Sequence, residues 1–142
     1  EPLLYLSHFF KVHREEYYDR LQAVRTDGDW EGWISFFLTA VAQVADEAAV
    51  RARAIIALLE YDRARLRSEL GRRSGMALDL LDVLVEQPII TSQSVREKIA
   101  KSQPTIDQLL SELVRLGLLQ ETTGRRRGRR FSYTGYLALF DA

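Results

Sequence analysis

Residues 91–119 read TSQSVREKIAKSQPTIDQLLSELVRLGLL, and this stretch is the most informative part of the chain for its fold. Thr91 or Ser92 is suited to cap a short helix and Ser102 to cap a second one, because their hydroxyls accept hydrogen bonds from first-turn N–H groups. Apolar residues of the second segment recur every three or four positions, and Gly117 then supplies a typical helix end. The stretch predicts two short helices joined by a tight turn.

The flanking segments extend this pattern in both directions. A leucine-rich helix is predicted before Pro88, which stops it because proline lacks an N–H and restricts the residue before it. Segments 118–121 and 130–133 show partial alternation around a loop rich in arginine and glycine, which predicts a hairpin, and a short helix follows at 134–140. This order of elements is that of a winged helix-turn-helix. We predict such a domain over residues 76–142, with the two-stranded hairpin as its only sheet.

The N-terminal part carries two helical patterns. One runs from Ser7, an N-cap candidate, to Gly28, with apolar or aromatic residues every three or four positions. The second is capped by Asp29 and extends to Leu70, and from Trp33 onward it contains neither glycine nor proline. The predicted fold class is therefore mainly α, with N-terminal helices followed by the winged helix-turn-helix.

The second helical pattern is long, and its end suggests a domain boundary. About forty helical residues would reach about 60 Å, so a bend near 46–47 or 61–62 is an alternative to one continuous helix. Residues 72–75 combine two arginines with Ser74 and Gly75, directly after Gly71, which is typical of a linker. We predict a helical segment at 1–71 and a linker at 72–75.

Composition places the chain among globular proteins. Of its 142 residues, 46% are hydrophobic and 28% are charged, which predicts a packed core. The absence of cysteine excludes disulfides and thiolate zinc sites, and it favours the cytoplasm. Because no apolar run approaches about 20 residues, we expect no membrane-spanning helix and no membrane partner. The first residue is not methionine, which favours a piece of a longer protein over a naturally short one.

The predicted winged helix suggests an interface for double-stranded DNA. The N-terminal turn of the helix after Ser102 would present polar side chains to base edges. The arginine-rich hairpin loop would contact phosphates or enter the minor groove. The candidate residues are Gln103, Thr105 and Gln108 on the helix, and Arg125, Arg126, Arg127, Arg129 and Arg130 on the loop.

A second interpretation stays open at this point. The helix after Ser102 carries Asp107 and Glu112 with Arg115 as its only base, an unfavourable charge for a surface that approaches phosphates. Such a domain is also compatible with protein docking or homodimer formation without nucleic-acid binding, since one fold hosts many functions. The arginines would then be a solvated loop that protects the edge of the hairpin.

Aromatic residues at helical spacing allow two readings as well. Trp30, Trp33, Phe36 and Phe37 are expected to lie in a core, and the alternative is a patch that binds a partner.

No complete set of catalytic, metal-binding or cofactor-binding groups is recognisable. His8 and His13 are five positions apart, about 140° around a helix, so they do not form a two-histidine metal face. Gly124 and Gly128 lie among arginines, but neither known glycine-rich phosphate motif is present. Adjacent carboxylates such as those of Glu15 and Glu16 lie among basic residues and are expected to be solvated. We therefore expect a non-catalytic chain without metal or cofactor.

The first third of the chain resembles the Fic family, in the stretch that follows that family's catalytic motif. The resemblance is carried by EPLLYLS at 1–7, then by Phe10, Arg14, Tyr17-Tyr18, Leu21, Val24-Arg25 and GDWEGWI at 28–34. Many bacterial Fic proteins continue through long helices into a C-terminal winged helix. Residues 123–133, which read TGRRRGRRFSY, and the following Tyr136-Leu137 are similar to that ending.

The resemblance implies a functional context but transfers no catalytic residue. Fic proteins typically transfer AMP from ATP onto protein hydroxyls, using a His-Pro-Phe-x-Asp/Glu-Gly-Asn-Gly-Arg loop that this chain does not contain. The chain would then be a regulatory, nucleic-acid-binding region of a protein adenylyltransferase, with the Fic catalytic core as a partner in a full-length parent. Catalysis by this chain would require an active site completed by another chain.

Overall fold

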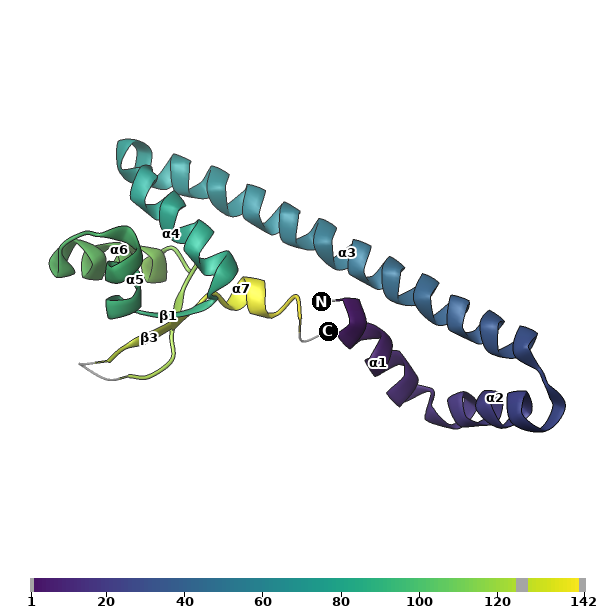
Figure 1. Cartoon of the computed structure of the whole chain (residues 1–142). Coiled ribbons are helices and arrows are strands. Elements are labelled where there is room, and N and C mark those ends of the chain that lie inside the picture. Colours follow the sequence, from purple (N-terminus) through teal and green to yellow (C-terminus); the bar gives the residue numbers. More distant parts are fainter. Residues whose placement is uncertain (1, 125–127, 141–142) are drawn as a thin grey trace. The chain divides into compact units, whose positions relative to one another are not determined.

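The structure is mainly helical, as predicted, with a small antiparallel sheet. The computed structural model of the chain describes residues 2–124 and 128–140 (Figure 1). Its elements, in chain order, are α1 (Pro2–Val12), α2 (Arg14–Asp27), α3 (Trp30–Leu70), the 3-10 helix η1 (Gly71–Arg73), α4 (Ser74–Glu86), β1 (Ile89–Thr91), α5 (Ser92–Ile99), α6 (Gln103–Arg115), β2 (Gln120–Glu121), β3 (Arg130–Ser132) and α7 (Thr134–Leu137).

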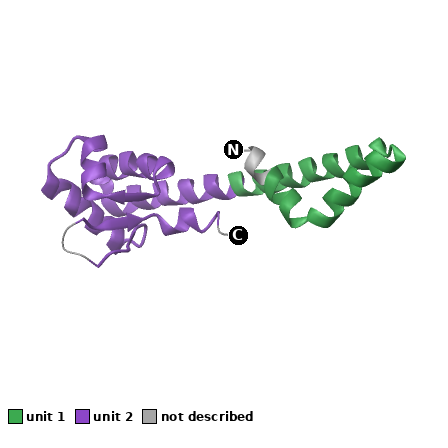
Figure 2. Cartoon of the chain, turned by 60° about the horizontal axis from the view of Figure 1, so that its bottom comes forward, with its two compact units in different colours: residues 1–52 green, residues 53–142 purple. Residues whose placement is uncertain are grey.

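The chain forms two compact units, residues 1–52 and residues 53–142 (Figure 2). We call them unit 1 and unit 2. Helix α3 contributes its first part to unit 1 and its last part to unit 2. The division between the units lies upstream of the linker that the sequence predicted at 72–75. Residues 72–75 instead form part of η1 and the start of α4. The physical reason is that Leu66 and Leu70, late in α3, are buried in the core of unit 2.

Unit 1 has a small aromatic core between α1, α2 and the first part of α3. Phe9, Phe36 and Ala40 are buried, and partly buried side chains that include Trp33 pack against them. The predicted helix from Ser7 to Gly28 is interrupted at His13, whose backbone is not helical, and Ser7 lies inside α1 rather than at its start. A capping residue type therefore did not mark the helix start in this case.

The junction of α2 and α3 follows local signals that the sequence carries. Gly28 ends α2 in the left-handed region, with φ of 70°, which is the conformation that favours glycine. Asp29 then caps α3, because its Oδ1 accepts a hydrogen bond from the Gly32 N–H at 2.9 Å. Helix α3 continues to Leu70 without a break, so neither of the two alternative bend positions interrupts it.

Helix α3 also contributes to an apolar stretch. Within Trp30–Glu86, an 18-residue window with at most two charged residues reaches a mean hydropathy of 1.3, and 11% of it is buried. By length and composition this stretch could cross a membrane, and the core helix of a soluble protein or a signal sequence has the same properties. The expectation that the chain has no membrane-spanning helix therefore stays a prediction.

The sheet of unit 2 has three strands in the order β1-β3-β2, all antiparallel, where the sequence predicted a two-stranded hairpin. Strand β3 is central: Phe131 lies opposite Ile90 of β1 and opposite Glu121 of β2. The extra strand is β1, which fills the three positions Ile89–Thr91 before α5. Three residues are too few to show a strand periodicity, and the partner strand lies some forty residues further along the chain.

The helices of unit 2 enclose one hydrophobic core. Thr91 caps α5 through a capping box, in which its hydroxyl accepts from the Ser94 N–H at 3.2 Å and its own N–H donates to Ser94 Oγ at 3.0 Å. Gly117, with φ of 72°, ends α6: the N–H of Leu118 donates to the Leu113 carbonyl at 3.0 Å. The predicted helix ends at Thr91 and Gly117 are confirmed, and Gly117 directs the chain from α6 into the sheet. Ser102 precedes α6 as predicted, but its hydroxyl forms no capping hydrogen bond, because it pairs with the Thr105 hydroxyl instead.

Candidate nucleic-acid interface

Helix α6 has one buried and one exposed face. Its apolar residues at spacings of three and four lie in the core of unit 2: Ile106, Leu109, Leu110 and Leu113. The opposite face is exposed and consists of Pro104, Gln108, Ser111 and Arg115. We call these four residues the α6 outer face. It holds small or uncharged polar side chains and one cation, which suits an approach to an anionic partner.

The three candidate residues of α6 occupy different environments. Gln108 belongs to the α6 outer face. Gln103 is half-buried, and its Nε2 donates a hydrogen bond to Asp107 Oδ1 at 2.9 Å. Thr105 is half-buried as well, with its Oγ1 2.7 Å from Ser102 Oγ. The structure therefore leaves Gln108 as the exposed member of the predicted set.

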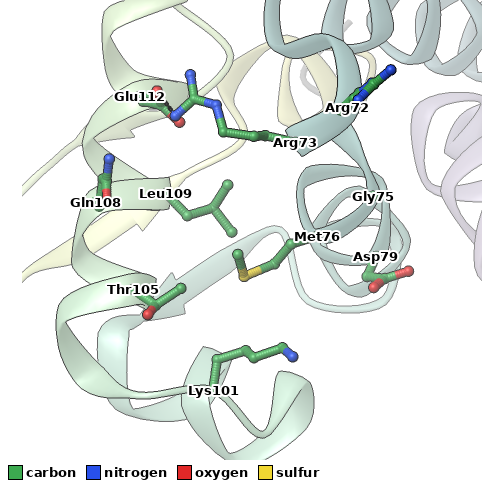
Figure 3. A pocket seen from close by; sticks show the side chains of 10 residues that line it. All are labelled: Arg72, Arg73, Gly75, Met76, Asp79, Lys101, Thr105, Gln108, Leu109 and Glu112. Atoms are coloured by element: carbon green, nitrogen blue, oxygen red, sulfur yellow. Dashed lines mark ion pairs between the residues drawn. The ribbon is translucent and has the colours of Figure 1, made fainter.

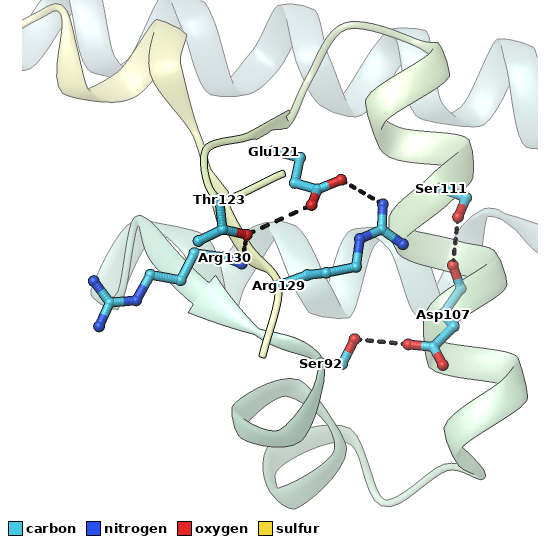
Figure 4. A network of polar contacts seen from close by, with 7 residues as sticks. All are labelled: Ser92, Asp107, Ser111, Glu121, Thr123, Arg129 and Arg130. Carbon is cyan, nitrogen blue, oxygen red and sulfur yellow. Dashed lines mark hydrogen bonds and ion pairs between the residues drawn. The ribbon is translucent and has the colours of Figure 1, made fainter. Parts of the chain in front are cut away.

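The acidic residues of α6 both have hydrogen-bond or ion-pair partners inside unit 2. The Asp107 carboxylate accepts a hydrogen bond from Ser92 Oγ at 2.6 Å (Figure 4), in addition to the hydrogen bond from Gln103. Glu112 forms an ion pair with Arg73 at 3.2 Å, and its side chain is 22% exposed. Their negative charges are therefore directed at partners within the fold rather than at the α6 outer face.

The arginines of the hairpin fall into three groups. Arg125, Arg126 and Arg127 lie outside the described residues. Arg129 is engaged: its Nη2 is 2.6 Å from Glu121 Oε2, and its guanidinium carbon is 5.0 Å from the centre of the Phe131 ring. Arg130 is exposed, and its side chain extends away from that ion pair (Figure 4). Of the candidates described, Arg130 is the one whose charge faces solvent.

The ion pair between Arg129 and Glu121 shifts the titration of both groups. The hydrogen bond from Arg129 lowers the pKa of the Glu121 carboxyl, and the same hydrogen bond raises the pKa of the Arg129 guanidinium. The pair also closes one end of the hairpin, because the two residues lie on either side of its loop. Arg129 thus contributes to the shape of the hairpin.

A buried polar pair joins the end of the sheet to α3. The hydroxyl of Tyr133 donates a hydrogen bond to Asp62 Oδ2, and the exposed fractions of the two residues are 1% and 5%. Burial first, and then this hydrogen bond, raise the pKa of Tyr133 far above its ordinary value. The residues are 71 positions apart, and no local pattern marks them as partners.

Two residues of the candidate interface were not among the sequence candidates. Ser111 and Arg115 belong to the α6 outer face, and the signal for them was available, since they lie opposite the apolar positions of the helix. Within residues 2–124 and 128–140, no group of three or more His, Cys, Asp or Glu side chains could hold a metal ion.

The arrangement can bind a partner through a polar helix face flanked by segments that carry cations. A comparison with models of known protein families gave no match to this chain.

Proposed function

We propose that unit 2 is a winged helix-turn-helix that binds double-stranded DNA, with α6 as its recognition helix. The observation that carries this proposal is that Asp107 and Glu112 both have partners inside the fold, two neutral donors for Asp107 and one cation for Glu112. These acids were the main argument from the sequence against an approach to phosphates. With both engaged inside the fold, the α6 outer face offers Gln108 for hydrogen bonds to base edges and Arg115 for a DNA base or a phosphate. The Ser111 hydroxyl donates to the Asp107 carbonyl at 2.8 Å, so it is offered to DNA as an acceptor.

The hairpin would supply contacts to the DNA backbone. Arg130 is exposed at the start of β3 and carries an uncompensated charge within the described part of the chain. A guanidinium in this position is suited to a phosphate oxygen. Arg129 would stabilise the hairpin through Glu121 instead of contacting DNA, which changes the role that the sequence suggested for it.

We further propose that the chain is the non-catalytic C-terminal region of a Fic-type protein adenylyltransferase, acting in the cytoplasm without a cofactor of its own. The resemblance of residues 1–7 and 28–34 to that family supports this context. The DNA-binding unit would then regulate or localise the enzyme, and the catalytic core of the parent would be a partner of unit 1.

Binding to mixed-sequence duplex DNA over a salt series tests the DNA-binding proposal. The affinity of the unaltered chain should fall steeply with salt, because each phosphate contact releases counterions. The double variant Arg115→Ala/Arg130→Ala should bind more weakly, with a slope of log affinity against log salt reduced by about 0.9 per lost phosphate contact. Fluorescence anisotropy of a labelled duplex measures both quantities.

The matched control removes two exposed cations elsewhere, in the double variant Lys11→Ala/Arg53→Ala. It carries the same change in net charge, so it should keep the affinity and slope of the unaltered chain. Lack of binding by the unaltered chain even at low salt would contradict the proposal, and so would equal losses in the two variants.

A second candidate function is homodimer formation, and exposed apolar side chains in unit 1 favour it. Trp30, Ile34 and Leu38 of α3 are 61%, 52% and 59% exposed, although Trp33 and Phe36 pack in the core of unit 1. The predicted aromatic cluster is thus divided, with Trp30 and Phe37 outside the core. In a full-length Fic-type parent, the catalytic core is the partner we expect for this face. Without the catalytic core, a second copy of the chain would cover this exposed face of α3.

Sedimentation equilibrium tests this second function. If the face mediates self-association, the chain should dimerise at high protein concentration, and Ile34→Ser/Leu38→Ser should restore the monomer because it removes apolar area from the contact. The variant Thr39→Ser/Gln43→Ser alters exposed polar positions of the same helix and should not change the equilibrium. A strict monomer at high concentration would contradict homodimer formation.

A further inference from the structure

A cleft lies between α6 and the segment that joins α3 to α4. Arg72 and Arg73 of η1 line one side of it, and Lys101, in the turn between α5 and α6, lines another part (Figure 3). Gln108 of the α6 outer face lines the same cleft, and Met76 and Leu109 line it between the two helices. The cleft thus adjoins the proposed DNA-binding face directly.

The cleft carries an excess of positive charge. Its titratable side chains are those of Arg72, Arg73, Lys101, Asp79 and Glu112. The ion pair of Arg73 with Glu112, at 3.2 Å, compensates one cation. Arg72 and Lys101 are exposed and form no ion pair within residues 2–124 and 128–140, while Asp79 opposes them with one negative charge. The lining therefore carries one net positive charge, which favours an anion, and in Figure 3 the side chains of Arg72 and Asp79 extend on the side of the cleft away from α6.

The position of the cleft around α6 indicates which anion it meets. At about 100° per residue, the cleft side of α6, with Thr105 and Glu112, lies about 80° from the centre of the α6 outer face. The side with Gln103 and Asp107 lies about 90° away in the opposite sense and lines a second cleft, which Arg129 of the hairpin also lines. The α6 outer face is thus flanked on both sides by segments that carry cations.

A helix in the major groove of DNA has negative phosphates on both sides, which matches cations on both sides of α6. The groove is about 12 Å wide and has a phosphate backbone along each edge. Arg129 of the hairpin lines the cleft on the side of α6 that would face one backbone, and the exposed Arg130 follows it at the start of β3. We propose that Arg72 and Lys101 bind phosphates of the other backbone, so that the α6 outer face is held between the two strands. This inference rests on the DNA-binding function proposed above and adds a contact site that the hairpin does not provide.

The single methionine of the chain makes the cleft directly observable. A methyl-labelled sample gives one Met76 signal by NMR, and the indole signals of Trp30 and Trp33 report on unit 1. Addition of duplex DNA should shift the Met76 signal and leave the two indole signals in place. In Arg72→Ala/Lys101→Ala the Met76 shift should be lost. The slope of log affinity against log salt should become less steep, by about 0.9 if one phosphate contact is lost and by about 1.8 if two are lost.

Two further variants keep this result interpretable. Lys11→Ala/Arg53→Ala removes one lysine and one arginine outside the cleft and should retain both the Met76 shift and the salt slope. Asp79→Asn removes the opposing acid and should raise the affinity for DNA, which a merely damaged fold would not do. If the unaltered chain binds DNA but neither the Met76 signal nor the slope of the cleft variant changes, the cleft site is wrong and DNA binding stands. If the unaltered chain does not bind, both proposals fall.

Discussion

Replacing Tyr133 with phenylalanine should lower the free energy of unfolding by about 1–3 kcal/mol, although it removes a single oxygen atom. The reason is the burial of Asp62, which is 5% exposed and accepts the hydrogen bond of Tyr133. Without that donor, the carboxyl group stays buried with an unmet hydrogen bond, and its desolvation is no longer offset. Urea unfolding followed by circular dichroism measures the change.

Tyr136→Phe is the matched control for this substitution. The two rings are stacked with centres 5.7 Å apart, and the Tyr136 hydroxyl forms no hydrogen bond within the described residues. Its removal should change the free energy of unfolding little. The double variant Asp62→Leu/Tyr133→Phe removes both polar partners and should recover part of the loss, since neither group is then left unpaired. Equal effects of the two single tyrosine substitutions would contradict a role for the buried pair.

Alkaline pH should destabilise the protein through the same tyrosine. The folded chain keeps the proton of Tyr133, because burial and Asp62 raise its pKa above the ordinary value of 10.0. The unfolded chain releases that proton above about pH 10, so the unfolded state binds fewer protons and gains stability as the pH rises. Tyr133 should therefore lower the free energy of unfolding by about 1.4 kcal/mol per pH unit above pH 10, and it should have no such effect at lower pH.

Comparison with Tyr133→Phe isolates this contribution from the other groups that titrate at high pH. Urea unfolding of both proteins is measured at intervals between about pH 8 and pH 12. The stability advantage of the unaltered chain should be constant up to about pH 10 and then decrease with the slope given above. An advantage that stays constant to pH 12 would show that Tyr133 ionises equally well in the folded chain.

The buried pair matters for the proposed function because of where it lies. Tyr133 directly follows β3, whose first residue is Arg130, and Asp62 belongs to α3. Ordering the end of β3 on α3 fixes the strand that carries the exposed arginine. A loss of this anchor should weaken DNA binding through the position of the hairpin, even though neither member of the pair lies on the α6 outer face.

Local signals were sufficient for most helices. Gly28, Asp29, Thr91 and Gly117 act through their own backbone conformation or through hydrogen bonds to residues within a few positions, and all four mark helix ends as predicted. Ser7 shows the limit of such signals, because it has the right residue type but lies within α1. A cap candidate competes with the packing of neighbouring turns, and that packing is not visible in a few residues.

Local sequence patterns were not sufficient to identify the exposed residues of the candidate interface. The sequence placed Gln103, Thr105 and Gln108 together near the start of one helix, yet two of them are used inside the fold. It showed Asp107 and Glu112 as acids on a presumed DNA-binding surface. The hydrogen bond of Ser92 to Asp107 and the ion pair of Arg73 with Glu112 depend on α5 and η1 packing beside α6, which joins residues 15 and 39 positions apart.

The sequence by itself determined the helical class of the chain, the order of its elements in the C-terminal half and the apolar face of α6, because these depend on periodicity and on short-range hydrogen bonds. The tertiary structure decided the third strand, the extension of unit 2 into α3 and the partners of each charged group near α6. Those features depend on contacts such as that of Asp62 with Tyr133, 71 positions apart. Such contacts form only when separate elements bury their apolar faces against one another, and no single segment encodes them.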